Sequence, residues 1–136
     1  MRNPFMFLSR SNHLSLTDST QNTFSQLFPR AINVEWTIGK RVDEAIFYQD
    51  GKEWIACFAK SSSLIEYRVN HDITDLPNHI ELAARHYGEI MNAISIHKHD
   101  VKTEAEYYEI IFRTNDLIRF SLLLNGKGET LSVSKL

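Results

Sequence analysis

The stretch of sequence that decides the fold is residues 24–58, which read FSQLFPRAINVEWTIGKRVDEAIFYQDGKEWIACF. Pro29 predicts the end of a helix, because proline cannot continue the helical hydrogen-bond ladder. Beyond Pro29, apolar and polar residues alternate, which is typical of β-strands with one buried face. Asp50-Gly51 lies between two such runs and predicts a hairpin turn, since this turn needs positive φ. The stretch therefore indicates a helix followed by antiparallel strands.

The residues on either side of this stretch extend the pattern to the whole first half of the chain. Residues 17–19 offer three candidate N-caps, because each side chain carries an oxygen that can accept from the free amides of the first helical turn. Phe24, Leu27 and Phe28 follow with the spacing of one helical stripe. Strands are then predicted at residues 32–38, 42–48, 53–59 and 64–70. Four neighbouring strands joined by short turns form an antiparallel meander.

The pattern then begins again. Thr74 and Asp75 are candidate caps, Pro77 suits a first helical turn, and Gly88 is placed for a left-handed residue after the helix. The apolar stripe of this second helix consists of Ile80, Ala83, Ala84 and Tyr87. Strands are predicted at about 92–99, 106–114, 117–124 and 129–134. Aligning the halves matches Phe28 with Tyr87 and Phe47 with Phe112, and places an insertion near residues 98–105.

We therefore predict an α+β fold in which two tandem repeats, each a helix plus an antiparallel β-meander, form one sheet with the helices packed on one face. Residues 1–16 are predicted to be an N-terminal arm, and residues 17–136 a single domain. Within that domain the first repeat covers about 17–73 and the second about 74–136. A chain of 136 residues is long enough to bury a core of its own.

Strand alternation assigns side chains to the two faces of the predicted sheet. Toward the helices it places Ala45, Phe47, Ile110 and Phe112, together with Trp54, Ala56, Phe58, Ile118, Phe120 and Leu122. The outer, helix-free face then carries aliphatic and tyrosine side chains among charged ones, which is typical of partner-binding or dimer surfaces. We predict a binding surface there, made of Ile46, Tyr48, Tyr107, Ile111, Arg113 and Leu123. The alternative is that twist and long charged side chains shield these residues singly.

Two functions remain open for such a domain. The first is a non-enzymatic module that binds a protein or peptide, or a second copy of itself as a homodimer. The second is a small-ligand carrier with a pocket between helices and sheet, lined by Trp36, Trp54, Phe58, Tyr87 and Phe120. The same five aromatic side chains are also what a packed core would contain. A cavity beneath the helices would favour the carrier, and a filled core would favour the module.

Composition and charge exclude several classes of function. The net charge is −2 and the basic residues form no stripe, so no nucleic-acid binding is expected. The single cysteine, Cys57, lies in an apolar run and is interpreted as a structural hydrophobe. The apolar run Phe5–Leu8 is shorter than the core of a signal peptide, and no run is long enough to insert into a membrane. As written, the chain is therefore expected to be cytoplasmic.

Candidate catalytic and metal-binding groups are few. His97 and His99 share one face of a strand, but a zinc site needs three or four ligands, so both are interpreted as ordinary exposed residues of a hairpin. Glu104 and Glu106 share a face without an evident cleft, whereas the adjacent Asp43 and Glu44 point in opposite directions. No phosphate-binding loop, nucleophile elbow or HExxH motif is present. We predict no enzymatic activity, no metal and no cofactor.

Residues 24–36, FSQLFPRAINVEW, resemble the opening of the PepSY-like, β-lactamase-inhibitor-like proteins of Bacteroidetes. Residues 43–47 and 50–54 are similar to their second strand, turn and third strand, and residues 76–87 resemble the start of their second repeat. The likeness spans roughly residues 17–135. It implies the same fold and, by family habit, a periplasmic or secreted location. It implies no catalytic residues, and the fold does not confer the inhibitor's target.

Overall fold

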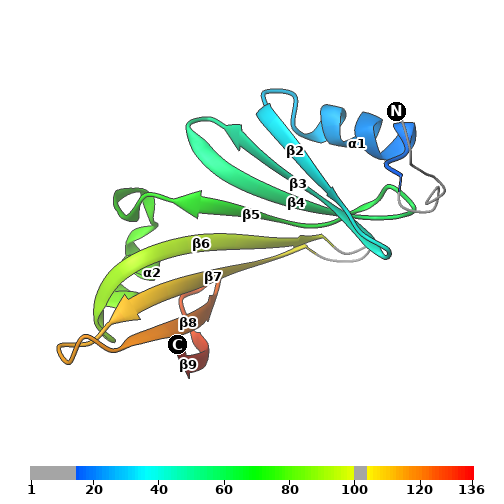
Figure 1. The fold of residues 1–136 in the computed structure, drawn as a ribbon. Helices are drawn as coiled ribbons and strands as arrows, with labels where there is room; N and C mark the ends of the chain where they lie inside the picture. The colour runs from blue at the N-terminus through cyan, green and yellow to red at the C-terminus, as the bar shows by residue number, and fades with distance from the viewer. Residues whose placement is uncertain (1–14, 100–103) are drawn as a thin grey trace.

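The computed structural model describes residues 15–99 and 104–136. Its first half consists of α1 (Asp18–Leu27), β2 (Ile32–Ile38), β3 (Val42–Gln49), β4 (Lys52–Ala59) and β5 (Leu64–His71). Its second half consists of a 3₁₀ turn η2 (Ile73–Asp75), α2 (Asn78–Arg85), β6 (Glu89–His99), β7 (Glu104–Arg113), β8 (Arg119–Asn125) and β9 (Thr130–Lys135). The eight strands form one antiparallel sheet in chain order, from β2 to β9 (Figure 1). The predicted α+β fold class is confirmed.

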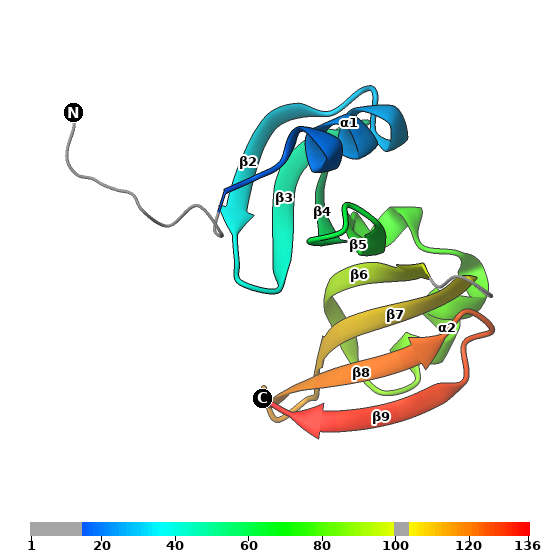
Figure 2. The same ribbon diagram turned by 90° about the vertical axis from the view of Figure 1, so that its right-hand side faces the viewer.

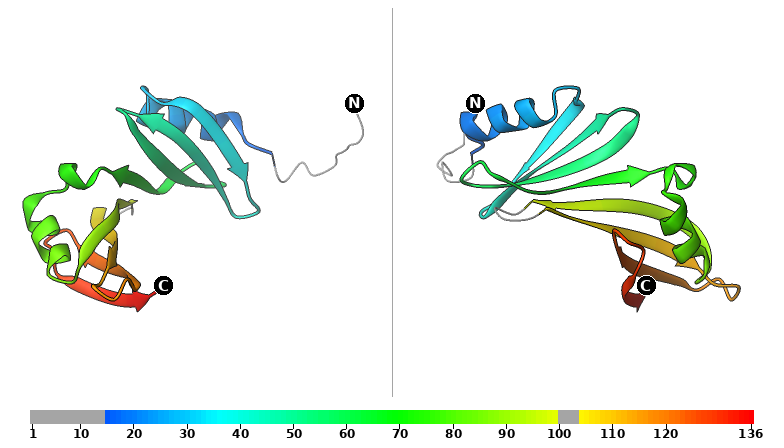
Figure 3. Two further views of the ribbon diagram at one scale, coloured as in Figure 1. Left: turned by 60° about the vertical axis from the view of Figure 1, so that its left-hand side comes forward. Right: turned by 180° about the vertical axis from the view of Figure 1, so that it is seen from behind.

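Both helices lie on the same face of this sheet. Strand register places Phe47, Trp54, Val69, Ser95, Tyr108 and Leu124 in one continuous row across β3 to β8. Phe47 and Trp54 pack in a cluster with the α1 residues, whereas Tyr108 and Leu124 pack with the α2 residues. The sheet is strongly twisted and bends so that the helices lie on the outside of the bend and the helix-free face on its inside (Figures 2 and 3).

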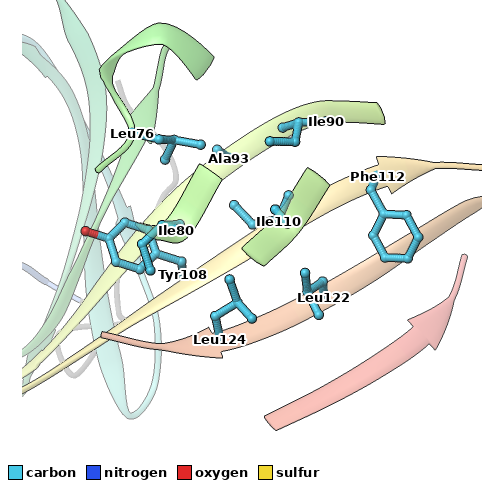
Figure 4. Packing of buried hydrophobic residues seen from close by; sticks show 10 residues of the cluster. Leu76, Ile80, Ile90, Ala93, Tyr108, Ile110, Phe112, Leu122 and Leu124 are labelled. Atoms are coloured by element: carbon cyan, nitrogen blue, oxygen red, sulfur yellow. The ribbon is translucent and has the colours of Figure 1, made fainter. Parts of the chain in front are cut away.

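The helix-covered face carries two separate hydrophobic clusters. The first joins Phe24 and Phe28 of α1 to Ala45, Phe47, Ala56 and Phe58, with Trp36, Trp54 and Tyr67 packed around them. The second joins Leu76, Ile80 and Ala84 to Ile90, Ala93, Tyr108, Ile110, Phe112, Leu122 and Leu124 (Figure 4). The faces predicted for β3, β4, β7 and most of β8 are thus confirmed, and the two helices cover different parts of one sheet.

Several local predictions are confirmed by the backbone. Thr17 is the N-cap of α1, and its side-chain oxygen accepts a hydrogen bond from the Thr20 amide at 3.2 Å. The helix ends at Leu27, two residues before Pro29. In the β3–β4 turn, Asp50 has φ 54° and Gly51 has φ 76°, so both turn residues adopt the left-handed conformation that the Asp-Gly pair indicated.

Other local predictions are wrong, and in each case tertiary contacts decide. Leu27 is 47% exposed, because the sheet contacts α1 along Phe24 and Phe28. Strand β2 contains an irregularity between Ile32 and Glu35, with Asn33 at φ 55°, which breaks the alternation expected there. Ile118 precedes β8 and is 36% exposed instead of facing the core.

The second helix also differs from its prediction. It covers only Asn78–Arg85, so Tyr87 lies beyond it, and its N-cap residue is Pro77, with no side-chain cap. Thr74 and Asp75 belong to the preceding 3₁₀ turn. Gly88 does not have positive φ; instead a Cβ there would lie 2.5 Å from the Arg113 carbonyl oxygen, so close approach to β7 favours glycine.

Candidate functional site

The helix-free face is the candidate site, and strand register shows how its side chains are brought together. One row runs across the sheet through Ile46, Ile55, Arg68, Ile96 and Tyr107. It belongs to the face opposite the clusters, because each of these residues neighbours a helix-facing residue along its strand. The row therefore places aliphatic side chains on both sides of a single arginine.

All six residues predicted for the binding surface lie on this face. Ile46 and Tyr48 are on β3, Tyr107, Ile111 and Arg113 on β7, and Leu123 on β8. They do not form one contiguous patch. Tyr107 and Leu123 lie together in a hollow, whereas Tyr48 is 46% exposed on β3. Arg113 donates to the Glu89 carboxylate at 2.7 Å near the other end of β7.

A hollow of about 570 Å³ lies on the helix-free face. Its lining comes from β5 to β9 and consists of Arg68, Ile96, Lys98, Tyr107, Glu109, Ser121, Leu123, Ser132 and Ser134. A smaller hollow of about 100 Å³ lies beside it, lined by Glu53, Ile55, Arg68, Asn70 and Ile94. Arg68 lines both hollows.

An ion-pair network runs beside the hollow. Arg68 Nε donates to Glu66 Oε2 at 2.8 Å, and Lys98 Nζ lies 3.0 Å from Glu66 Oε1. On the other side, an Arg68 guanidinium nitrogen lies 3.7 Å from Glu109, whose carboxylate accepts a hydrogen bond from Ser121 at 3.2 Å. The network holds two cations and two carboxylates, so its charges balance while its contacts orient Arg68.

Glu66 is the half-buried acid of this network. Burial alone would raise the pKa of its carboxyl group, but the hydrogen bonds and charges of Arg68 and Lys98 outweigh burial and lower that pKa. The Cys57 thiol on the neighbouring strand responds differently: burial, and then the charges of Glu44 and Glu66, raise its pKa. A thiol with a raised pKa is a poor nucleophile, which fits the structural role predicted for Cys57.

The lowered pKa of Glu66 predicts an acid-dependent contribution to stability. A carboxyl group whose pKa is lower in the folded state stabilises the fold at pH values above its unfolded pKa, about 4.5. That contribution is lost as pH falls through the lower, folded pKa. We expect Glu66→Gln to reduce the free energy of unfolding near pH 7 and to have less effect at pH 3. Urea unfolding at both values measures this; an equal loss at both would contradict it.

Sequence reasoning predicted only two of the nine residues that line the hollow, Tyr107 and Leu123. The other seven were not among the predicted site residues: Arg68, Ile96, Lys98, Glu109, Ser121, Ser132 and Ser134. Alternation along β5, β6 and β9 could have assigned each residue to a face. However, aligning the two halves assigned side chains to the two sheet faces only in β3, β4, β7 and β8. Which residues meet across the sheet depends on register, and register is set by pairing.

The other predicted groups lie elsewhere. His97 and His99 line a hollow of about 690 Å³ on the helix-covered face, near Leu27 of α1. The interpretation of His97 as an ordinary exposed residue is wrong, since its side chain is only 27% exposed and its ring stacks on Tyr67. Within residues 15–99 and 104–136, no group of three or more His, Cys, Asp or Glu side chains is placed to hold a metal ion.

The pocket required by the carrier hypothesis is not formed by its five aromatic residues. Trp36, Trp54 and Phe58 belong to the α1 cluster, whereas Tyr87 and Phe120 belong to the α2 cluster. Ring contacts fill the space inside each cluster, as for Phe24 with Phe47 at 5.0 Å and Phe112 with Phe120 at 5.3 Å. These side chains are core, as the alternative interpretation predicted.

No helix in the described ranges is long and apolar enough to cross a membrane.

The fold is similar to that of several solved Bacteroides proteins. A BLIP-like protein from Bacteroides fragilis has a TM-score of 0.75 at 14% identity, covering 93% of this chain and 90% of that one. A DUF2874 family protein from Bacteroides uniformis also has a TM-score of 0.75, at 16% identity over 89% of this chain and 90% of that one. A protein from Bacteroides eggerthii, described as a candidate periplasmic protein, has a TM-score of 0.72 at 17% identity over 89% of each chain.

These likenesses support the resemblance to β-lactamase-inhibitor-like proteins of Bacteroidetes at the level of the fold. The sequence itself matches no protein-family model and no curated protein.

Proposed function

We propose that this protein is a non-enzymatic binding module that captures a protein or a peptide through its helix-free face. The observation that carries the proposal is the hollow of about 570 Å³ on that face. Its lining combines apolar side chains, Ile96 and Leu123, with a tyrosine and with arginine and lysine held in ion pairs. Tyrosine and arginine are the residue types that most often anchor protein interfaces.

Three features favour a macromolecular partner over a small ligand. The hollow is a shallow part of a wide face, and Ile46, Tyr48 and Ile111 continue that face beyond the hollow. The paired charges around Arg68 can form hydrogen bonds at the rim of an interface, where charge contributes to specificity more than to affinity. Among the fold neighbours, one is named for its likeness to an inhibitor protein and one as a candidate periplasmic protein. Within this proposal, these two names support a partner that the protein binds outside the cytoplasm.

The test changes the helix-free face without changing the core. We expect Ile46→Lys and Leu123→Lys each to abolish capture of the partner, because a buried ammonium without an anion is costly in an interface. Leu82→Lys is the control, since Leu82 is 71% exposed on α2, on the helix-covered side. Wild type and the three variants are immobilised, exposed to native extract and compared by mass spectrometry. Circular dichroism confirms that each variant is folded.

A second copy of the chain is included as a partner in this test. Sedimentation velocity of the same four proteins shows whether the wild type self-associates and whether the face variants lose that association. A partner retained equally by wild type, the face variants and the Leu82→Lys control would contradict the proposal.

A further inference from the structure

A chain of polar side chains, centred on the buried hydroxyl of Ser95, lies between the two hydrophobic clusters on the helix-covered face. His71 Nε2 lies 2.7 Å from the Ser95 hydroxyl, and the same hydroxyl lies 3.0 Å from His97 Nε2. His97 Nδ1 in turn lies 3.5 Å from a Glu106 carboxylate oxygen. Ser95 is only 1% exposed. We call His71, Ser95, His97 and Glu106 the polar seam.

The polar seam lies where the two halves of the sheet meet. Residues 66–71 of β5 pair with residues 93–98 of β6, and this ladder joins the half covered by α1 to the half covered by α2. His71 is on β5, and both Ser95 and His97 are on β6. The side chains of the polar seam therefore link the two strands whose pairing holds the halves together.

The hydrogen bonds of the polar seam have a direction when both imidazoles are neutral. With the His97 Nδ1 proton directed at Glu106, Nε2 of His97 is free to accept the hydroxyl proton of Ser95. The Ser95 oxygen then accepts a hydrogen bond from Nε2–H of His71. Every polar atom named here has a partner in this arrangement, so the neutral polar seam is satisfied.

The hydrogen bonds of the polar seam can rearrange to accept one added proton on an imidazole, but not a second. If His97 becomes an imidazolium, its Nε2–H donates to Ser95, and Ser95 can donate to His71 once His71 adopts its other tautomer. If His71 is also protonated, both imidazolium rings donate to the same oxygen. The hydroxyl proton of Ser95 then has no acceptor within the seam, and two cations flank one buried hydroxyl. Leaving a buried polar group unpaired is costly, and like charges at this distance repel.

From this geometry we propose that the polar seam is an acid-sensitive joint: protonation of both histidines weakens the β5–β6 connection between the two halves of the sheet. The first proton goes to His97, which faces a carboxylate, and the second goes to His71. The two titrations are coupled, because the rings share one hydrogen-bond partner.

The charged groups around each ring agree with this order. Burial lowers the pKa of His71, and the charges of Lys52 on β4 and of protonated His97 lower it further, whereas Asp75 of η2 and Glu106 act in the opposite direction. Burial also lowers the pKa of His97, against the charge of Glu106 on β7. The ring of Tyr67 on β5 stacks on His97 at 4.5 Å, and that of Tyr108 on β7 lies 6.5 Å from His71.

The direction of the effect follows from these lowered pKa values. A histidine whose pKa is lower in the folded state stabilises the fold above its unfolded value, about 6.5. That stability is lost as pH falls from there through the folded pKa. On the other side of β6, Ile94 and Ile96 line the two hollows of the helix-free face. Opening of the joint would thus reshape the binding surface, a consequence that rests on the proposed function.

Amide hydrogen exchange tests the joint without any partner. We expect the amides of β5 and β6 in the wild type to exchange several-fold faster at pH 5.0 than at pH 7.5, after correction for the intrinsic rate. His71→Gln removes the second titration while keeping a neutral group that can hydrogen-bond to Ser95, so its exchange should respond to acid less than that of the wild type, with only the contribution of His97 remaining. His86→Gln is the control, because His86 is an exposed residue at the end of α2; it should respond as the wild type does.

The outcomes separate clearly. Equal corrected exchange at the two pH values in the wild type, or an acid response in His71→Gln as large as that of the wild type, would overturn the inference. Nuclear magnetic resonance titration of the imidazole protons gives a second check, in which His71 and His97 should titrate below the ordinary histidine pKa of about 6.5 and in two coupled steps. A normal acid response together with no captured partner would refute the proposed function and leave the joint intact.

Discussion

Replacement of Phe47 by alanine is expected to lower the free energy of unfolding by about 3–5 kcal/mol, the cost typical of deleting a buried phenylalanine. Phe47 is completely buried at the centre of the α1 cluster. Its ring centroid lies 5.0 Å from those of both Phe24 and Phe28, and it also stacks on Trp54 at 6.1 Å. Because α1 contacts the sheet through Phe24 and Phe28, the cavity would loosen the helix as well as the strands.

Urea unfolding followed by tryptophan fluorescence measures this loss. Trp36 and Trp54 pack against the α1 cluster, so their emission reports on it directly. The matched control is Tyr48→Ala, which removes the adjacent aromatic residue from the helix-free face, where it is 46% exposed. We expect the control to cost less than about 1 kcal/mol. Similar losses for the two variants would contradict the assignment of faces on β3.

Replacement of Asp43 by alanine is expected to cost about 2–3 kcal/mol, the range for loss of hydrogen bonds to a charged group. The Asp43 side chain is only 2% exposed. Its Oδ1 atom lies 2.6 Å from Lys60 Nζ and accepts a hydrogen bond from the Gly39 amide at 3.2 Å. The carboxylate thus ties the β2–β3 turn to the end of β4, and alanine would leave Lys60 without this anion.

Two further variants show which part of the interaction matters. Asp43→Asn keeps an oxygen that can accept from Gly39 but removes the negative charge, so we expect a loss between that of the alanine variant and the wild type. Glu44→Ala is the matched control, because the adjacent side chain is exposed on the opposite face, and its loss should be within about 0.5 kcal/mol. Thermal unfolding monitored by circular dichroism gives all three values. An alanine variant as stable as wild type would contradict this role, because it would show that water accepts the hydrogen bonds of Lys60 and of the Gly39 amide without cost.

The regular parts of the fold could be predicted because their signals are local. Alternation along β3 and β4 placed Ala45, Phe47, Ala56 and Phe58 in the core, where all four have 0% exposure. The Asp50-Gly51 turn was equally evident, since few other residue pairs accept two positive φ angles. These features depend on neighbouring residues in the chain, so one sequence is enough to find them.

The failures have a common physical origin in long-range pairing. Gly88 suggested a helix cap, but a Cβ there would clash with the Arg113 carbonyl of β7, 25 positions away along the chain. The irregularity of β2 appears only when its register with β3 is known. His97 was interpreted as an exposed hairpin residue, because nothing near it in sequence shows that Tyr67 covers one side of its ring.

The sequence by itself determined the α+β fold class, the strand faces of β3, β4 and β7, and the family resemblance, because periodicity and turn chemistry are properties of short segments. Only the tertiary structure decided which residues of five different strands surround the hollow on the helix-free face. It alone also brought His71, Ser95 and His97 into one hydrogen-bonded chain. The reason is that strand register and sheet twist fix neighbours across a sheet, and both emerge from the packing of the whole domain.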